Sequence, residues 1–372
     1  MVRPSRSTRS ATDTVATDET LRLVRLPLAD TLRQLHDSDS TVALQRGIEA
    51  LRRQIDDPCS ALRAASAVDD VTTFSRRYLF DALDQIAAAF TLERARYYAA
   101  RLLRATLEVR TGAINDIDLN RWKEYDDILT DSLWLFDRRD SSGVHRAGYW
   151  GNFVPQIPHQ LMRRYTRRGD LVIDPFAGAG TTLIEGRRLG RHTIGVELRA
   201  DVVEQARATL AAEPDRYGAL CALEVGDSAV FDWHAALARH GRRSAQLAIL
   251  HPPYFDIIRF SDDPRDLANA PSVEVFLARL GDTVARAADV LDNGRYLALV
   301  IGDKYAHGDW IPLGFLAMNE VLQRGFGLKS IIVKNFDETT GKRSQKELWR
   351  YRALVGGFYV FKHEYIFVFR KK

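Results

Sequence analysis

Two short stretches of this chain carry residues that could do chemistry on a ligand. The first is DPFAGAG at residues 174–180, and the second is HPPY at residues 251–254. Glycines permit backbone conformations closed to other residues and let the main chain approach a ligand closely. Consecutive prolines hold the chain extended, and because proline has no N–H, the carbonyl groups there face no competing donor. The two stretches predict a ligand-binding turn and a rigid strand end; for HPPY alone, a purely structural turn is the alternative.

The glycine turn does not fit the usual phosphate-binding motifs. A dinucleotide fingerprint needs a third glycine where Leu183 stands, and a P-loop needs Gly-Lys-Ser/Thr, which is absent. Glu197 ends the next predicted strand, where a carboxylate can accept both hydroxyls of a ribose. Asp227 ends the strand after that, in a place to meet an adenine amino group. These features predict a nucleoside ligand without a pyrophosphate, and S-adenosylmethionine has that combination of groups.

The elements that must position these residues alternate between strand and helix after residue 160. The β-rich runs are LVIDPF, HTIGVEL, ALEVGDS, LAILHPP, RYLALVIGD, LKSIIVKN and HEYIFVF. Seven strands separated by helices predict an α/β fold with a twisted, mainly parallel sheet. Ligands bind such sheets beyond the carboxyl ends of the strands. Five polar residues close their strands, so we expect them to rim one cleft, although single acids there often only form turns or caps: Asp174, Glu197, Asp227, His251 and Asp303.

The part of the chain before this sheet has a helical pattern. Residues 21–125 repeat apolar side chains at three- and four-residue spacing, which predicts an α-helical region. Residues 1–20 are expected to be a solvated, disordered tail, and residues 126–372 form the predicted catalytic domain. The helical region is expected to serve packing, homodimer contacts or nucleic-acid contact.

Composition narrows the class of protein further. The 372 residues carry a net charge of +4, with a pI near 9.0, which permits a polyanionic partner without requiring one. Two cysteines exclude a disulfide framework and a four-cysteine zinc site, so a reducing compartment, the cytoplasm, is expected. No apolar run approaches the roughly 20 residues that span a bilayer, and the N-terminus lacks the apolar core of a signal peptide.

Together, DPFAGAGTT and HPPY resemble the cofactor and catalytic motifs of the amino-group DNA methyltransferases, which modify adenine N6 or cytosine N4. The segment GNFVPQIPHQLMRRYTRRGDLVIDPF is similar to the one that these proteins place before the glycine turn. The resemblance covers residues 134–372. It implies a Rossmann-like seven-stranded sheet with helices on both faces, S-adenosylmethionine as cofactor, and a DNA base flipped out of the duplex as substrate.

The resemblance also implies a role for each motif residue. The cofactor-binding residues would be Asn152, Phe153, Asp174, Phe176, Gly178, Gly180, Glu197 and Asp227, and the catalytic ones His251, Pro252, Pro253 and Tyr254. In the family, the first side chain of the tetrapeptide and a proline carbonyl accept the two N–H groups of the target amine, while the aromatic residue stacks on the base. No metal is needed for this chemistry.

His251 departs from the Asp, Asn or Ser of the family. Neutral imidazole has one acceptor nitrogen and imidazolium has none. We therefore expect either that His251 accepts the amine proton while neutral, or that it only shapes the turn while a backbone carbonyl suffices. The departure leaves the choice between adenine and cytosine open.

Contacts to nucleic acid are expected from an insert at about residues 336–361, which mixes basic and aromatic residues. Its candidate contacts are Lys342, Arg343, Lys346, Trp349, Arg350 and Arg352, and a solvated hairpin is the alternative. A cognate restriction enzyme is a candidate partner. An RNA methyltransferase of the guanine-N2 type and a non-catalytic binding protein with a relic cofactor fold are the alternatives for the function.

Overall fold

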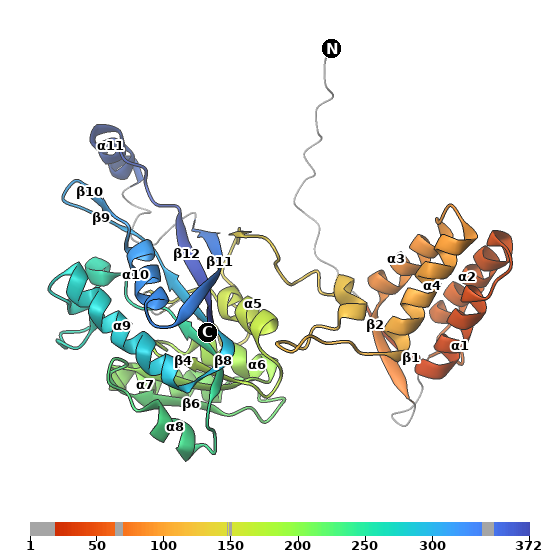
Figure 1. Ribbon diagram of the computed structural model, residues 1–372, viewed down its shortest axis with the longest axis horizontal. Helices are drawn as coiled ribbons and strands as arrows, with labels where there is room; N and C mark the ends of the chain where they lie inside the picture. Colours follow the sequence, from red (N-terminus) through yellow and green to blue (C-terminus); the bar gives the residue numbers. More distant parts are fainter. Residues whose placement is uncertain (1–18, 64–69, 147, 149–150, 337–345) are drawn as a thin grey trace, which may run out of the picture. The chain divides into compact units, whose positions relative to one another are not determined.

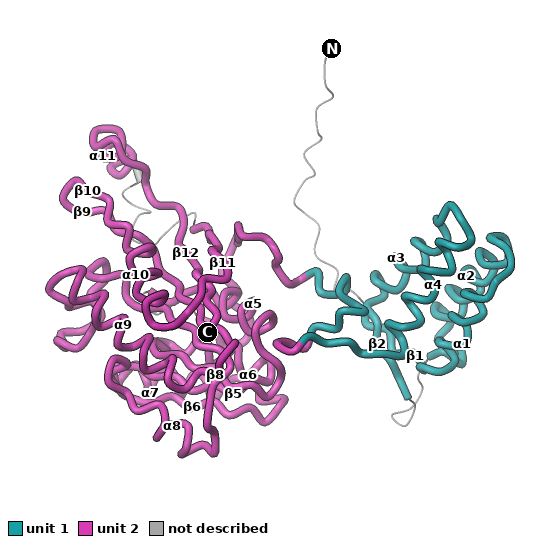
Figure 2. The backbone as a smooth tube through the Cα atoms, viewed as in Figure 1, with its two compact units in different colours: residues 1–112, 117–126 teal, residues 113–116, 127–372 magenta. Residues whose placement is uncertain are grey.

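The computed structural model describes residues 19–63, 70–146, 148, 151–336 and 346–372. The chain divides into two compact units, one of residues 1–112 and 117–126 and one of residues 113–116 and 127–372 (Figure 2). Most of the predicted tail lies outside the described residues. Across the described part of the chain, no helix has the length and apolar character to cross a membrane.

The first unit combines helices with a small sheet. Its helices are α1 (Arg25–His36), α2 (Thr41–Asp56), α3 (Arg76–Ala87), α4 (Leu92–Leu107) and the 3-10 helix η1 (Leu119–Glu124). Strands β1 (Thr20–Val24) and β2 (Val71–Ser75) pair antiparallel. The helices were predicted, but the expectation that residues 21–24 are helical is wrong. Leu21 and Leu23 are buried on either side of an exposed Arg22, which is the two-residue period of a strand.

Side-chain caps fix where three of these helices begin. The side chains of Ser40, Ser75 and Thr91 accept backbone N–H bonds at the starts of α2, α3 and α4. The apolar faces then close on a core of their own, which includes Leu32, Ile48 and Leu83. This unit therefore has the separate core that a domain needs.

The second unit is built on a sheet that includes all seven predicted strands (Figure 1). These are β4 (Leu171–Asp174), β5 (His192–Glu197), β6 (Cys221–Val225), β7 (Ala245–Leu250), β8 (Leu291–Ile301), β11 (Phe326–Asn335) and β12 (His363–Lys371). With the short β3 (Leu133–Trp134), the order within the described residues is β3-β11-β12-β8-β7-β4-β5-β6. Among these described strands, only β12 runs antiparallel to its neighbours, so the predicted α/β class with a mainly parallel sheet is confirmed.

Helices cover both faces of this sheet. One face packs on α5 (Gln156–Tyr165), α6 (Thr181–Leu189) and α7 (Ala200–Ala211), and the other on α8 (Trp233–Arg239), α9 (Val273–Val290) and α10 (Leu313–Leu322). Along β7, Leu247 and Ile249 join the core under α5, whereas Ala248 and Leu250 join the core under α9. Buried on both faces, these strands are continuous apolar runs, which is why they were recognisable.

Two further elements lie outside the main sheet, one after β8 and one between β11 and β12. Strands β9 (Lys304–Ala306) and β10 (Asp309–Ile311) form a hairpin, and α11 (Lys346–Gly356) lies between β11 and β12 in the chain. Tyr305 stacks on Phe358 at 4.0 Å between ring centroids, so the hairpin packs against the segment that follows α11. Figure 1 shows both elements extending from the sheet in the same direction.

Candidate active site

The carboxyl ends of β4, β5, β6 and β7 open into one pocket. Its space is about 810 Å³ including the open mouth, within the usual size of a small-molecule site. The lining residues are Gly151, Asn152, Phe153, Pro175, Phe176, Ala177, Gly178, Ala179, Glu197, Leu198, Arg199, Asp227, Ser228, His251, Pro252, Pro253, Phe260, Arg265, Asp266 and Leu267. Residues from the glycine turn and from HPPY, separated in sequence, thus share one cavity.

Most of the residues predicted from the motifs line this pocket. The cofactor candidates that do so are Asn152, Phe153, Phe176, Gly178, Glu197 and Asp227, joined by His251, Pro252 and Pro253. Asp174, Gly180 and Tyr254 are not in its walls. Asp303, expected on the same rim, instead accepts bonds from the Gly314 N–H and the Trp310 indole, so that expectation is wrong.

The glycine turn is held in a shape that demands glycine. Gly178 and Gly180 have φ angles of +48° and +79°, where side chains are disfavoured. Asp174 is buried below the turn and accepts the Phe176 N–H at 2.9 Å. Burial raises the pKa of Asp174 to about 7. Asp174 thus holds the turn from beneath and is not in the pocket wall, and its predicted contact with the cofactor stays a prediction.

Two carboxylates face the pocket with acceptor capacity left over. The Glu197 oxygens accept the backbone N–H groups of Gly178, at 3.1 Å, and Arg199, at 2.9 Å. Asp227 accepts the Ala229 N–H at 3.0 Å through one oxygen. Each carboxylate oxygen has two lone pairs, so both side chains are fixed by backbone donors and can still accept ligand hydroxyl or amino groups. Burial raises the pKa of Glu197.

The segment before α5 is tied to the first turn of α6. Thr181 donates to the Asn152 side chain at 2.6 Å, and Arg139 donates to the carbonyl groups of Asn152 and Phe153. Asn152 is thereby oriented by α6, the helix that follows the glycine turn. This arrangement brings the predicted Asn152 and Phe153 to the same cavity as the turn.

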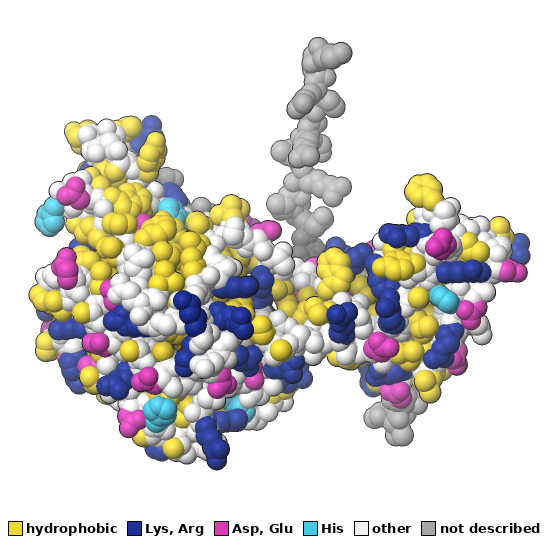
Figure 3. Space-filling view, in the orientation of Figure 1, with side chains coloured by type: hydrophobic (Ala, Val, Ile, Leu, Met, Phe, Trp, Pro, Cys, Tyr) yellow, Lys and Arg dark blue, Asp and Glu magenta, His cyan; other side chains and the backbone are white. Residues whose placement is uncertain are grey.

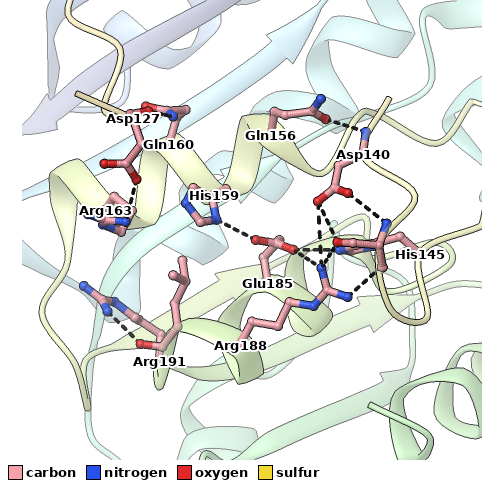
Figure 4. Close-up of polar contacts among 12 residues, drawn as sticks. Asp127, Asp140, His145, Gln156, His159, Gln160, Arg163, Glu185, Arg188 and Arg191 are labelled. Atoms are coloured by element: carbon pink, nitrogen blue, oxygen red, sulfur yellow. Dashed lines mark hydrogen bonds and ion pairs between the residues drawn. The ribbon is translucent and has the colours of Figure 1, made fainter. Parts of the chain in front are cut away.

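A buried polar cluster anchors the same segment farther from the pocket (Figure 4). Glu185 of α6 bonds His145 at 2.6 Å and His159 at 2.8 Å. Although burial alone would raise it, these two histidines lower the pKa of Glu185 to about 2. Arg188 joins the cluster by donating to Glu185 at 3.3 Å, and it also donates to Glu213 at 2.9 Å. The carboxylate is thus held ionised and links α5, α6 and the segment that leads to Asn152.

The segment after HPPY supplies wall residues that sequence reasoning did not assign to the site. Phe260, Arg265 and Asp266 line the pocket, and the Arg199 side chain donates to the Phe260 carbonyl at 2.8 Å. A β-carbon on Gly151 would approach the Phe260 ring to 2.8 Å, so glycine lets the two segments meet.

His251 lies between an aromatic ring and a hydroxyl. Its ring stacks on Phe153, with centroids 4.7 Å apart, and its Nε2 lies 3.2 Å from the Tyr254 hydroxyl oxygen. Burial lowers the pKa of His251 to about 4. The imidazole is therefore neutral near pH 7 and keeps one acceptor nitrogen.

Tyr254 points toward the sheet. Its hydroxyl donates to the Glu364 carboxylate at 2.6 Å, and its ring lies so close to Gly302 that a β-carbon there would approach it to 2.9 Å. Glu364 of β12 pairs with Lys334 of β11 at 3.2 Å, and these two residues are register partners in the sheet. Burial raises the pKa of Tyr254 well above its ordinary value, so the hydroxyl keeps its proton.

Lys334 and Glu364 were missed from the sequence. Both are nearly buried, at 6% and 8% exposure. Lysine and glutamate are almost never buried unless paired, so the charged residues inside the apolar runs LKSIIVKN and HEYIFVF were the available signal. Their partners come from strands far from HPPY, which a motif cannot reveal.

The basic and aromatic insert contains a helix. Among the predicted contacts, Arg350 and Arg352 of α11 are exposed and the Arg352 guanidinium lies over the Trp349 ring at 5.2 Å. Lys346 begins the helix, while Lys342 and Arg343 lie outside the described residues. Exposed apolar side chains of this insert, Leu348, Tyr351, Leu354, Val355 and Tyr359, are part of the hydrophobic surface in that region of Figure 3.

Known proteins match parts of this chain. Residues 89–208 match a family model described as DNA methylase, of the N6/N4 type. This part of the chain is thus similar to the N6/N4 DNA methylase family. The match confirms the family inferred from the motifs. It begins between α3 and α4, before residue 134 where the resemblance was expected to start, and it ends before HPPY.

The chain spans about a third or less of the length of the curated relatives described here. The type II methyltransferase M.MjaII of Methanocaldococcus jannaschii is 39% identical over 56 residues, covering 15% of this chain and 10% of the relative. M2.DpnII of Streptococcus pneumoniae is 34% identical over 101 residues, covering 26% of this chain and 34% of the relative. The solved structure of TrmN from Thermus thermophilus aligns at 17% identity with a TM-score of 0.37, over 59% of this chain and 49% of that one.

Proposed function

We propose that this protein transfers a methyl group from S-adenosylmethionine to an exocyclic amine, N6 of adenine or N4 of cytosine, in DNA. The observation that carries the proposal is the shared pocket: the glycine turn, Glu197 and the His251-Pro252-Pro253 wall line one cavity. A cofactor site and an amine-gripping motif must share a cavity for direct transfer to occur.

The residues present fit S-adenosylmethionine. Glu197 would accept the ribose hydroxyls, Asp227 the adenine amino group, and Asn152, Phe176 and Gly178 would surround the methionine end. Bound there, the cofactor supplies a sulfonium methyl group for an amino nitrogen. Asp174 and Gly180 would shape the turn without touching the ligand, since neither lines the pocket.

The target amine would be held by the HPPY wall. Its lone pair is delocalised into the base ring, so two acceptors directed at its N–H groups are needed to draw that lone pair out of the ring plane. His251 and a carbonyl of the double proline would be those acceptors. They would speed the reaction because they are already positioned and oriented toward the amine. Base stacking by Tyr254 stays a prediction, since its ring packs against Gly302 outside the pocket wall.

DNA contact is proposed for α11 and its flanks. The exposed Arg350 and Arg352 suit phosphate contact, and the neighbouring aromatics suit base stacking. Replacing each arginine by alanine should lower the salt dependence of DNA binding by about one unit of slope; an unchanged slope in both variants would argue against this surface. The contacts of Lys342, Arg343, Lys346 and Trp349, a homodimer through the first unit and a cognate restriction enzyme stay predictions.

The decisive experiment measures transfer of labelled methyl groups to duplex DNA, tRNA and rRNA, with sequencing of host DNA for modified bases. We expect N6-methyladenine or N4-methylcytosine in DNA with the natural chain and its loss in His251→Phe. His234→Phe, at an exposed histidine of α8, is the matched control. Methylation of RNA alone would favour the guanine-N2 type of activity, and cofactor binding without transfer to any polymer would favour a relic.

A further inference from the structure

Four side chains form a hydrogen-bonded chain that ends in the pocket. The Lys334 ammonium pairs with Glu364 at 3.2 Å, Glu364 accepts the Tyr254 hydroxyl at 2.6 Å, and the Tyr254 oxygen lies 3.2 Å from His251 Nε2. Lys334, Glu364 and Tyr254 come from β11, β12 and the segment after β7. None of the three lines the pocket, whereas His251 does.

The direction of each bond follows from the number of protons available. Lysine only donates, and a carboxylate only accepts. Glu364 therefore cannot donate, and Tyr254 must donate its single hydroxyl proton to that carboxylate. Toward His251, the same tyrosine oxygen can then only accept. The proton between His251 and Tyr254 must belong to His251 Nε2.

A neutral imidazole with its proton on Nε2 has its lone pair on Nδ1. Among the residues that the structure describes, no side chain or backbone group bonds this second nitrogen. Stacking on Phe153 occupies one face of the ring, not its nitrogen atoms. Nδ1 is thus an acceptor in a pocket residue with no partner of its own.

We propose that Glu364 and Lys334, acting through Tyr254, are positioning residues that fix His251 as its Nε2–H tautomer and so present Nδ1 as the acceptor for the target amine. The acceptor role rests on the proposed function, but the tautomer does not. Asp, Asn and Ser at this position each have an oxygen that accepts a hydrogen bond near pH 7. Neutral histidine accepts only at its unprotonated ring nitrogen. A fixed tautomer is what lets histidine stand in their place.

The test compares two single variants that act in different ways. In Tyr254→Phe the ring remains and only the hydroxyl is lost, so the tautomer is released and becomes mixed. In Glu364→Gln, the Lys334 ammonium donates to the amide oxygen, so the amide NH2 donates to the Tyr254 oxygen. The hydroxyl must then donate to His251 Nε2, which inverts the tautomer and turns Nδ1 into a donor. Glu364→Gln should therefore impair the acceptor at Nδ1 more than Tyr254→Phe does.

The tautomer can be read without substrate from two-bond ¹H–¹⁵N spectra of the full ¹⁵N-labelled chain. The chain has nine histidines, and the signal of His251 is identified by its loss in His251→Asn. We expect protonated Nε2 in the natural chain, a mixture in Tyr254→Phe and protonated Nδ1 in Glu364→Gln. The double variant should return to the mixture, because the hydroxyl that carries the inversion is gone.

Tyr365→Phe is the matched control. Tyr365 also lies on β12, bonds His363 Nε2 at 3.1 Å and donates to Asp303 at 3.4 Å, but does not contact His251. It should alter the His363 signal and leave that of His251 unchanged. If methyl transfer is measurable, kcat should fall on the order of 100-fold in Glu364→Gln and about 10-fold in Tyr254→Phe, with KM for the cofactor unchanged.

Two outcomes separate this proposal from the proposed function. Protonated Nδ1 in the natural chain, or an unchanged tautomer in Glu364→Gln, overturns the positioning role whatever the activity. The expected tautomers without methyl transfer to any nucleic acid would uphold the positioning role and count against the methyltransferase.

Discussion

The pocket has a cofactor wall, which includes Glu197 and Asp227, and a target wall formed by His251, Pro252 and Pro253. The hydrogen bonds behind these two walls join residues at very different separations along the chain. On the cofactor wall, Glu197 is fixed by backbone groups 2 and 19 residues away, and Asp227 by one 2 residues away. On the target wall, Tyr254 bonds a carboxylate 110 residues later, and His251 depends on that bond. The cofactor wall is a local structure that recurs as a motif, whereas the chemical state of the target wall is set by the distant strands β11 and β12.

The largest effect should come from removing the acceptor of the target wall. His251→Phe keeps a ring for Phe153 to stack on but offers no lone pair, so kcat should fall about 100- to 1,000-fold, as when one positioned hydrogen-bonding group is lost at other active sites. The measurement is single-turnover methyl transfer with saturating cofactor.

His251→Asn is the matched variant, since its amide oxygen restores an acceptor and should keep most of the rate. Cofactor affinity should be the same in both variants, because the walls are separate. A rate in His251→Phe equal to that of the natural chain would mean that the backbone carbonyl suffices and that His251 only shapes the turn.

The second effect should fall on the other wall. Glu197→Gln keeps one acceptor oxygen but loses the charge, which costs one charge-assisted bond of about 1.5–3 kcal/mol. The Kd for S-adenosylmethionine should therefore rise roughly 10- to 100-fold by titration calorimetry. Glu224→Gln on β6, whose carboxylate bonds Arg239, is the control. Unchanged affinity in Glu197→Gln would exclude this residue as the ribose acceptor.

The same contrast explains what the sequence could predict. Buried strands such as β7 are continuous apolar runs, so the sheet was recognisable. The glycine turn, Glu197 and Asp227 each lie at or just after the end of such a strand, so the cofactor wall was recognisable too. Strand β1 was hidden because its alternation of Leu21 and Leu23 runs directly into helix α1. Glu364 was hidden because its role exists only once β12 pairs with β11 and approaches Tyr254.

A smaller effect concerns the carboxyl under the glycine turn. The pKa of Asp174, about 7 when folded, exceeds the ordinary value near 4. The folded state therefore holds a proton that the unfolded state has lost between these values, and stability declines as pH rises from about 4 to about 7. Asp174→Asn removes that decline, so its melting temperature relative to the natural chain should increase from pH 5 to pH 8.

Asn can still accept the Phe176 N–H through its amide oxygen, which keeps the turn's hydrogen bond. The gain across this range should be roughly 2 kcal/mol of unfolding free energy. Asp170→Asn is the comparison, since Asp170 bonds Arg295 and the Arg167 N–H near the opposite end of β4. A melting-temperature difference independent of pH in Asp174→Asn would contradict a raised pKa.

The smallest expected effect is the response of the target wall to mild acid. A histidine with the ordinary pKa of about 6.5 would lose roughly three quarters of its neutral form at pH 6. The pKa of His251 is instead lowered to about 4, so this imidazole stays neutral in the folded protein until the pH approaches that value. Methyl transfer by the natural chain and by His251→Asn should therefore follow the same pH profile between pH 8.5 and 6.

The two profiles should separate only near pH 4, where the natural chain gains imidazolium and loses its acceptor. Brief pH jumps in single-turnover experiments reach this range before acid unfolds the chain. A fall in the methyl-transfer rate of the natural chain that is centred near pH 6.5 and absent in His251→Asn would mean that water reaches the target wall and that His251 has an ordinary pKa. An acid limb that is identical in both variants down to pH 4 would remove His251 as the titrating acceptor.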